Sequence, residues 1–524
     1  MLESMNLPSS AILTTGLALA AIFRAAVVLY RLYFHPLCCV PGPKLAGATS
    51  LYLRYYEVVE GGGITQLLPG LHKKYNSPVI RIAPNHVHIN DIEAYKRAFT
   101  TKPSFRKCPD FYKSAQGVDT ILTTTDPQRH RVMRNAMLPL FTPRDMTRIF
   151  LIGRDHITKV AQVMSRQGRD GQLLDLLVYL RALTANFVAG TLLDHPSELV
   201  SYEAPQSGWI IAQEFIGRYR WIFADIPFLV PIGLFLLSVS PEWITIGFRD
   251  LFQVRTAFPV RVLANILQHC ENVGNRVLST KREREKEAPQ TVFDKLLSDT
   301  SYKLTSRDTL ALFQQAVVLM IAGTASPAIT LTTAFFYILK SKDIETRLQD
   351  ELDNLEQRFP GGMTSADFDW RELHKLPYLE AVVKESLRII PAVPGLLPRV
   401  VPSTGLNIAS HYLPPGTRIS AAHYVFHHNE TIFPNPGKFD PDRWLNKSPE
   451  DLQLMEQYFM PFSKGPRACI GMKQSWVFMY TAVVYLLGRF EMRLGEGLPG
   501  VLEWVDDGTA VPVVRPVVRV VERG

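Results

Sequence analysis

One cysteine lies in a short stretch whose composition suits a metal ligand. The segment PFSKGPRACIGM places Cys469 between Gly465 and Gly471, directly before an apolar helical pattern. A sulfur near a helix N-terminus is favoured as a thiolate, and Arg467 adds positive charge nearby. A thiolate in a glycine-shaped loop with an aromatic neighbour, Phe462, suits an axial ligand of haem iron. On residue type alone, a buried free thiol is the commoner alternative.

The remaining cysteines exclude other uses of this residue type. The chain has five cysteines, and the other four are at positions 38, 39, 108 and 270, so no C-x-x-C pair occurs. A zinc ribbon and a thioredoxin-like redox motif are therefore excluded. An odd and sparse set of cysteines also argues against a secreted disulfide scaffold.

The composition permits a large hydrophobic core and gives no sign of a nucleic-acid partner. The 524 residues are 47% hydrophobic and 20% charged, and the formal net charge is +8. The basic residues are dispersed without a long Lys/Arg block, which is typical of a solvated surface and predicts no nucleic-acid binding. A basic patch that docks an acidic protein stays open as an alternative.

The N-terminus carries an apolar segment that predicts a membrane anchor. Residues 11–30 are apolar apart from one arginine. A cleaved secretory signal would end in small residues, whereas here Tyr30 and Arg31 suit a membrane interface. Because the positive flank follows the apolar run, the body should lie in the cytosol. We predict an uncleaved single-pass anchor over residues 1–33 and a catalytic domain over residues 34–524.

The body reads as mainly helical with a small amount of strand. Helical periodicity dominates between residues 90 and 390, whereas residues 391–450 are proline-rich and predict loops with short strands. Strand-like segments occur near residues 79–90, 398–420 and 500–520. The fold class we predict is therefore mainly α with a minor β region.

Two further apolar runs compete with the anchor for the membrane. Residues 316–339 contain no charge, which by length indicates a transmembrane helix or a helix buried through the centre of a large domain. Gly323 and Pro327 lie within that run and suit a helix distorted for a purpose. Residues 226–239 are too short to span and predict an interfacial segment or a core loop.

The cysteine loop and the segments around it resemble a known family. The pattern F-x-x-G-x-R-x-C-x-G is filled at all its fixed positions, a match that average composition would produce in roughly one chain of this length in ten thousand. With it, and with YRLYFHPL, PGPKLAG and DPQRHRVMRNAMLPLF, nearly the whole chain resembles cytochromes P450, in particular filamentous-fungal microsomal members of secondary metabolism. The resemblance implies the cytochrome P450 fold after an N-terminal transmembrane helix. It also implies heme b, with Cys469 as the iron ligand and Phe462 packed over the sulfur.

The resemblance also implies a buried scaffold and a set of cations. Glu385 and Arg388 of KESLR are three residues apart, so they share one helical face and can pair. In the family an arginine at the place of Arg443 joins this pair and locks the loop beneath the haem. Haem propionates need cations when they are buried. The resemblance assigns four residues to them: His130, Arg134, Arg399 and Arg467.

On the oxygen side the sequence departs from the family pattern A/G-G-x-D/E-T-T. By resemblance the long apolar run is the central helix over the haem, with Ala325 at the place of the acid and Ser326 at that of the threonine. Oxygen activation needs protons, which a hydroxyl relays and a carboxylate helps to supply. Pro327 lacks the N–H that would bond to the Gly323 carbonyl. We expect the relay to use Ser326, the freed Gly323 carbonyl and water, whereas Thr324 offers a hydroxyl on a different face.

The resemblance implies a haem-thiolate monooxygenase that inserts oxygen from O2 into a lipophilic secondary metabolite, with a terpenoid favoured. No flavin or nicotinamide motif occurs, so electrons are expected from NADPH-cytochrome P450 reductase at the endoplasmic reticulum membrane. Family position assigns five segments to the substrate: Phe111 to Thr123, Phe215 with its neighbours, Leu319 to Ala322, Val393 to Leu397, and Asp506 to Ala510.

Two other function classes stay open. A haem-thiolate isomerase or dehydratase would use the iron without external electrons, and the missing acid at position 325 keeps that alternative. A non-catalytic haem sensor would share Cys469 but would need neither a reductase nor a lipophilic site.

Overall fold

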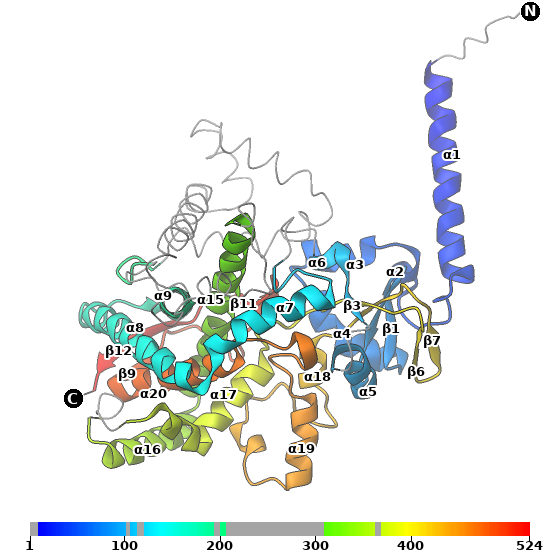
Figure 1. Cartoon of the computed structure of the whole chain (residues 1–524). Helices are drawn as coiled ribbons and strands as arrows, with labels where there is room; N and C mark the ends of the chain where they lie inside the picture. Colours follow the sequence, from blue (N-terminus) through cyan, green and yellow to red (C-terminus); the bar gives the residue numbers. More distant parts are fainter. Residues whose placement is uncertain are drawn as a thin grey trace, which may run out of the picture.

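The computed structural model describes residues 9–100, 105–112, 120–192, 200–205, 309–361 and 368–523. It shows a largely helical body from which one long helix projects (Figure 1). Three features singled out in the sequence lie outside the described residues: Cys270, Phe215 and residues 226–239.

The apolar N-terminus forms helix α1 (Ser9–Leu29), which continues into a π-helix, η1 (Tyr30–Phe34). Figure 1 shows that α1 stands clear of the body. Its span-length part, Thr14–Phe34, has 21 residues, and none of it is buried in the protein. An apolar helix of this length that no protein covers fits the predicted anchor.

The body consists mainly of helices, as the periodicity predicts. The longer ones are α4 (Ile64–Tyr75), α7 (Pro127–Met137), α8 (Pro143–Arg169), α9 (Leu176–Leu192), α15 (Thr309–Lys340), α16 (Lys342–Arg358), α17 (Pro377–Ile389), α19 (Pro449–Tyr458) and α20 (Met472–Arg489). The shorter ones are α2 (Lys44–Ala48), α3 (Leu51–Arg54), η2 (Tyr55–Val59), α5 (Ile92–Tyr95), η3 (Lys96–Thr100), α6 (Pro109–Tyr112), η4 (Leu138–Phe141), η8 (Trp370–Lys375), α18 (His423–His427), η9 (Pro441–Trp444) and η10 (Gly465–Arg467).

Short strands form the minor β region, and its main sheet joins segments that are far apart in the sequence. This sheet has the order β1-β2-β8-β5-β3. Its strands are β1 (Val79–Ala83), β2 (His86–Ile89), β8 (Arg418–Ser420), β5 (Arg399–Val400) and β3 (Arg106–Lys107). The smaller sheets contain β4 (Leu174–Asp175), β12 (Val517–Glu522) and β9 (Phe490–Leu494), then β6 (Leu406–Ile408) and β7 (His411–Leu413), then β10 (Trp504–Asp506) and β11 (Ala510–Pro512).

Helix α15 runs through the body and resolves the choice left open for the second apolar run (Figure 1). Of its span-length part, Gln314–Lys340, 67% is buried inside the protein. The helix packs against α9, α17 and α20. A helix that is apolar all round is buried when other helices surround it. Helix α15 is therefore a core helix, and its residues near the middle can line an internal site.

Candidate active site

The cysteine loop is shaped by a close approach to the preceding part of the chain. Gly465 begins η10 with a left-handed φ of 79°. A Cβ added at this glycine would lie 2.4 Å from the carbonyl oxygen of Phe99 in η3. Only glycine combines that backbone conformation with that contact. The loop that carries Cys469 thus packs closely against η3.

The Cys469 side chain combines an accessible surface with a deep position. It is accessible, yet it lies so deep in the protein that burial raises the pKa of the thiol. A hydrogen bond from the Gly471 amide and the charge of Arg134 lower this pKa in part. Arg134, rather than the expected Arg467, is thus the cation that acts on the sulfur. Burial outweighs both effects, and a bound metal would favour the thiolate, because a metal deprotonates a coordinating thiol.

Phe462 and Gly471 stand at the two ends of the turn that presents the sulfur. The Cys469 amide donates a hydrogen bond to the Phe462 carbonyl at 2.9 Å. The Phe462 ring lies 5.9 Å from the ring of Trp476 in α20. A Cβ at Gly471 would meet the Cys469 sulfur at an ordinary 4.0 Å, so the protein itself leaves room there. That Phe462 packs over an iron-bound sulfur stays a prediction.

The four residues assigned to the propionates lie together. Burial first, and then the charges of Arg467, Arg134 and Arg399 among others, lower the pKa of His130 to about 3. The His130 and Arg399 side chains are buried. Burial and the charge of Arg399 lower the pKa of Arg467 to about 10. Helix α7, the cysteine loop and strand β5 thus bring these groups to one place.

A fifth basic residue, Lys107, belongs to the same cluster, and the sequence reasoning missed it. The pairing of β3 with β5 places Lys107 directly opposite Arg399. Its Nζ donates to the Leu122 carbonyl at 2.5 Å and lies 4.2 Å from the centre of the Tyr112 ring. Burial, and then the charges of Arg399 and Arg467, hold its pKa well below the usual range. No local pattern signals this lysine, because its partner strand is distant in the sequence.

The cluster fits a buried dianion. In the described part of the chain, no carboxylate lies within ion-pair distance of Lys107 or of the four assigned cations. The Nη1 of Arg467 is buried without a hydrogen-bond partner. The Asp126 carboxylate favours the charged form of Arg467 through space, yet burial of these basic groups is costly, and the two propionates of haem would supply further negative charge. The cations and the accessible sulfur therefore fit heme b.

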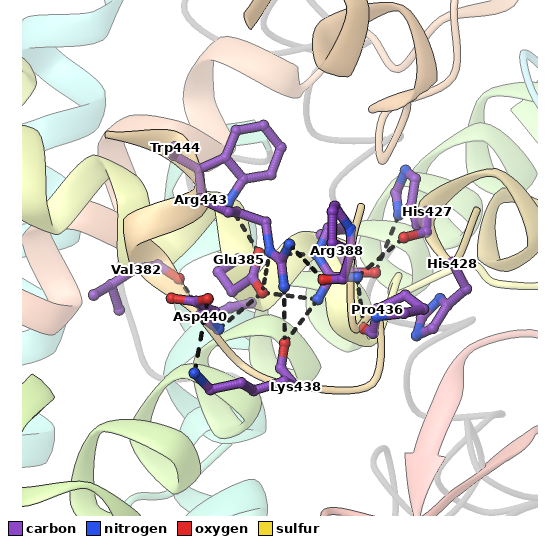
Figure 2. Close-up of polar contacts among 12 residues, drawn as sticks. Val382, Glu385, Arg388, His427, His428, Pro436, Lys438, Asp440, Arg443 and Trp444 are labelled. Carbon is purple, nitrogen blue, oxygen red and sulfur yellow. Dashed lines mark hydrogen bonds and ion pairs between the residues drawn. The ribbon is translucent and has the colours of Figure 1, made fainter. Parts of the chain in front are cut away.

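The predicted pairing of Glu385 with two arginines is confirmed. Figure 2 shows the Glu385 carboxylate between Arg388 and Arg443. Arg388 donates to it through Nε at 2.8 Å and Nη2 at 2.7 Å. Arg443 donates through Nε at 3.0 Å, and the Trp444 indole donates at 2.9 Å. Glu385 and Arg388 are both 0% exposed, so this is a buried ion pair that neighbouring donors complete.

Arg388 also ties α17 to the chain that follows α18. Its guanidinium donates to the carbonyl oxygens of His427, Pro436 and Lys438 at 3.0, 2.8 and 3.1 Å. These bonds are drawn in Figure 2. Besides its bonds to Glu385, Arg388 thus holds the end of α18 and the irregular backbone near Pro436 and Lys438, which precede the cysteine loop.

Helix α15 presents Ser326 and Ala322 on an accessible face. The two residues are one turn apart, and both retain accessible surface. A Cβ added at Gly323 would instead lie 2.6 Å from Val188 of α9. Thr324 is buried and its carbonyl accepts a hydrogen bond from α9 at 2.8 Å. Ser326 is therefore the hydroxyl on the open side, whereas the catalytic roles of Gly323 and Thr324 stay predictions.

Several of the predicted substrate segments meet. The Ile121 amide donates to the Gln315 side chain of α15 at 2.9 Å. The Ala510 amide donates to the Ala392 carbonyl at 3.1 Å. The Asp506 carboxylate is buried and accepts a hydrogen bond from a threonine of α4 at 2.8 Å. The segment near 121 thus contacts α15, the segments near 392 and 510 contact each other, and β11 packs against α15. Asp506 serves the packing of these segments.

The chain is similar to known proteins over nearly its whole length. The family model described as Cytochrome P450 matches residues 43–504. The chain is 33% identical to cytochrome P450 monooxygenase hkm5 of Aspergillus hancockii, over 93% of this chain and 90% of that protein. It is 32% identical to cytochrome P450 monooxygenase ankB of Aspergillus thermomutatus, over 94% and 89%. It is 31% identical to cytochrome P450 monooxygenase cloA of Claviceps purpurea, over 92% and 90%.

Proposed function

The chain belongs to the cytochrome P450 family of monooxygenases, and we propose that it inserts oxygen from O2 into a lipophilic secondary metabolite with electrons from NADPH-cytochrome P450 reductase. One observation carries the proposal. An accessible sulfur at Cys469 lies deep in the protein, near a cluster of basic residues whose pKa values are lowered by burial and by one another. This arrangement supports Cys469 as the iron ligand. It supports five residues as the holders of the propionates: Lys107, His130, Arg134, Arg399 and Arg467.

Ligation by Cys469 is tested with carbon monoxide. Haem, when bound through a thiolate, supplies the chemistry of O2 reduction and gives a strongly red-shifted Soret band in the reduced, CO-treated protein. We expect this band in the wild type and its loss in Cys469→His. The buried Cys108 offers a matched control, because Cys108→Ser should keep the band. A Cys469→His variant that retained both band and activity would refute the assignment.

The reductase would dock on exposed cations near the cysteine loop. Arg131 of α7 and Lys473 of α20 are exposed. Helix α7 contacts the loop, because Arg134 donates to the Ala468 carbonyl at 2.7 Å. Charge reversal of Arg131 and Lys473 should raise the KM for the reductase and change its salt dependence, since rim charges steer association. Arg519→Glu, at an exposed position of β12, should leave the KM and its salt dependence unchanged. The CO spectrum of every variant should match that of the wild type.

The anchor would hold the enzyme at the endoplasmic reticulum membrane as a single pass with a cytosolic catalytic domain. The support is the uncovered helix Thr14–Phe34 and the core position of α15. Removing residues 1–29 should release most of the protein from microsomes and leave haem binding intact. If α15 spanned the bilayer instead, protease protection would place the two halves of the body on opposite sides.

The substrate would be of intermediate size and lipophilic, with a terpenoid favoured. The described residues of the substrate segments carry few charges, and the Asp506 carboxylate among them is engaged within the protein. Metabolite profiling of a deletion strain tests this class, because the accumulated precursor identifies the substrate. Turnover that requires O2, NADPH and reductase separates a monooxygenase from an isomerase, a dehydratase or a sensor.

A further inference from the structure

His427 has one defined protonation state because of its two hydrogen bonds. It ends α18 and is 0% exposed. Its Nε2 lies 2.9 Å from the backbone nitrogen of Met460, and its Nδ1 lies 3.3 Å from the carbonyl oxygen of Arg388. A backbone amide can only donate, so Nε2 must accept and Nδ1 must carry the proton. His427 is therefore a neutral imidazole that links Arg388 to Met460.

The link between His427 and the buried ion pair is reciprocal. The Arg388 guanidinium donates to the His427 carbonyl at 3.0 Å, while the His427 ring faces the Arg388 carbonyl (Figure 2). Ring contacts also connect His427 to the buried ion pair. The Phe459 ring stacks on His427 at 5.5 Å, and the Trp444 ring packs on Phe459 at 4.9 Å. Trp444 in turn donates to Glu385.

Met460 is the last residue before the cysteine loop. It is buried, and its carbonyl accepts a hydrogen bond from the Ser463 amide at 2.9 Å. The neighbouring Phe462 carbonyl accepts the Cys469 amide at 2.9 Å. The amide that His427 holds therefore fixes the start of the backbone turns that end at the sulfur.

We propose that His427 is a positioning residue for the iron ligand. It acts through Met460, the residue at which the cysteine loop begins. The inference rests on the proposed haem-thiolate function and extends it, because neither the E-x-x-R pair nor the loop pattern contains this histidine. His427 connects the ion pair to the loop: Glu385 accepts from Arg388, Arg388 donates to the His427 carbonyl, and the His427 ring accepts the Met460 amide.

The surroundings of His427 keep the ring neutral. A protonated ring would lose the acceptor for the Met460 amide and would add a cation beside Arg388. The titratable groups that face it are His423, His428 and Arg388, and none of them is acidic. Burial first, and then these charges, hold the pKa of His427 well below its usual range. The acceptor is thus present throughout the neutral pH range.

Three substitutions separate the two hydrogen bonds of His427. His427→Phe keeps the aromatic stack and removes both bonds. His427→Gln keeps an amide oxygen at the distance of Nε2, so it can still accept the Met460 amide. His427→Asn is shorter and reaches only the Arg388 carbonyl. The equally buried His423, one turn earlier on α18, is the matched control as His423→Phe.

The test uses the full-length holoprotein and measures haem dissociation and the share of the thiolate-type CO band. In His427→Phe and His427→Asn, haem should dissociate about 10- to 100-fold faster, the range for loss of a group that orients a metal ligand, and part of the thiolate band should be lost. His427→Gln and His423→Phe should behave as the wild type. Wild-type behaviour of His427→Phe, or equal loss in His427→Gln and His427→Asn, would overturn the inference. Absence of the thiolate band in the wild type would instead overturn the proposed function.

Discussion

Two adjacent side chains of α15 bear on the proposed proton relay. Ser326 is the hydroxyl on the accessible face, whereas Ala325 is buried and cannot ionise. Pro327 lies inside the helix and frees the carbonyl of Gly323 from its usual partner. With no carboxylate at position 325, we expect the proposed relay to depend on Ser326 together with water or a substrate hydroxyl.

Removal of the Ser326 hydroxyl should uncouple the enzyme. Ser326→Ala should slow product formation by about a hundredfold or more, the contribution of a single general acid, and release more peroxide per NADPH consumed. Ala325→Asp should restore part of the coupling. Thr324→Val should leave it unchanged, because Thr324 lies against α9. Product formation that needs no NADPH and is unaffected by Ser326→Ala would favour the isomerase alternative.

Lys107 should affect the apoprotein and the holoprotein in opposite directions. Burial and neighbouring arginines hold the pKa of its amine well below the usual range. A basic group that is harder to protonate in the folded state than in the unfolded state lowers stability at neutral pH, so Lys107→Met should raise the unfolding temperature of the apoprotein. The same change should speed haem dissociation, because one propionate partner is lost. Calorimetry and haem transfer to a haem-free globin measure the two effects. The exposed Lys447 provides the control as Lys447→Met, and a shift of both quantities in the same direction would contradict the assignment.

Between elements, the same 3-10 helix takes part in a buried and an exposed ion pair. In η9, Arg443 donates to the buried Glu385 at 3.0 Å, while Asp442 receives two bonds from the partly exposed Arg347 at 2.8 and 2.6 Å. Burial decides their importance, since breaking a buried pair leaves a desolvated charge behind whereas an exposed pair is replaced by water.

Glu385→Gln should therefore be far more damaging than Asp442→Asn. The first change leaves Arg388 and Arg443 without a counter-charge and should cost about 3–5 kcal/mol of unfolding free energy. The second should cost about 0–1 kcal/mol. Denaturant unfolding of the two variants, read together with the CO spectrum, compares them at the same helix. Similar losses in both would mean that the buried triad is not a major support of the cysteine loop.

A chain of neutral histidines joins α4, β2 and the end of β8. The Ala422 amide donates to Nε2 of His88 at 3.0 Å, and His88 Nδ1 lies 2.7 Å from His72 Nε2. His72 Nδ1 faces the Ser77 carbonyl at 2.7 Å. Since the amide can only donate, each ring passes one hydrogen bond to the next. Burial lowers the pKa of His72 to about 4 and holds that of His88 well below the usual range.

This chain should make the protein sensitive to mild acid. The unfolded pKa of histidine is about 6.5, and the folded pKa is lower, so the folded state prefers the neutral rings. Their contribution to stability is complete above the unfolded pKa and is lost as pH falls through the folded pKa of about 4 for His72. The unfolding temperature should fall between pH 7 and pH 5, and His72→Gln should flatten that slope. His411→Gln, at a partly exposed position, should not.

At the scale of the whole molecule, one buried arginine joins the anchor to the body. Arg81 of β1 donates through Nη1 to the Arg31 carbonyl at 2.9 Å, and through Nε and Nη2 to the Pro84 carbonyl. Arg31 returns a bond to the Ala48 carbonyl at 3.0 Å. The end of the apolar N-terminal helix is therefore fixed to α2 and β1, so we expect the proposed anchor to set the orientation of the body.

Two truncations should differ in stability although both remove the anchor. Deletion of residues 1–29 keeps the Arg31 carbonyl, whereas deletion of residues 1–33 leaves Arg81 buried with one donor unpaired. The longer deletion should lose about 1.5–3 kcal/mol, the value of a hydrogen bond to a charged group. Urea unfolding of the two proteins measures the difference. Equal stability would show that the joint contributes nothing.

The sequence alone predicted the parts of this protein that depend on local pattern. Three features could be predicted because each needs only neighbouring residues in a fixed order. They are the cysteine loop, the apolar N-terminal helix and the pair Glu385–Arg388. The main strands near 79–90, 398–420 and 500–520 were also foreseen, because apolar alternation between turn residues marks them. The short strands β3, β4 and β9 were not, since two of them have two residues each and owe their existence to pairing.

Tertiary structure decided everything that depends on partners far apart in the sequence. Residues 316–339 had the composition of a membrane span, and only the helices around α15 made them a core. Lys107 became part of the cation cluster because β3 pairs with β5. His427 became a link because α18 brings its ring to the Met460 amide. Charge, burial and hydrogen bonding depend on distance in space, and the sequence records only distance along the chain.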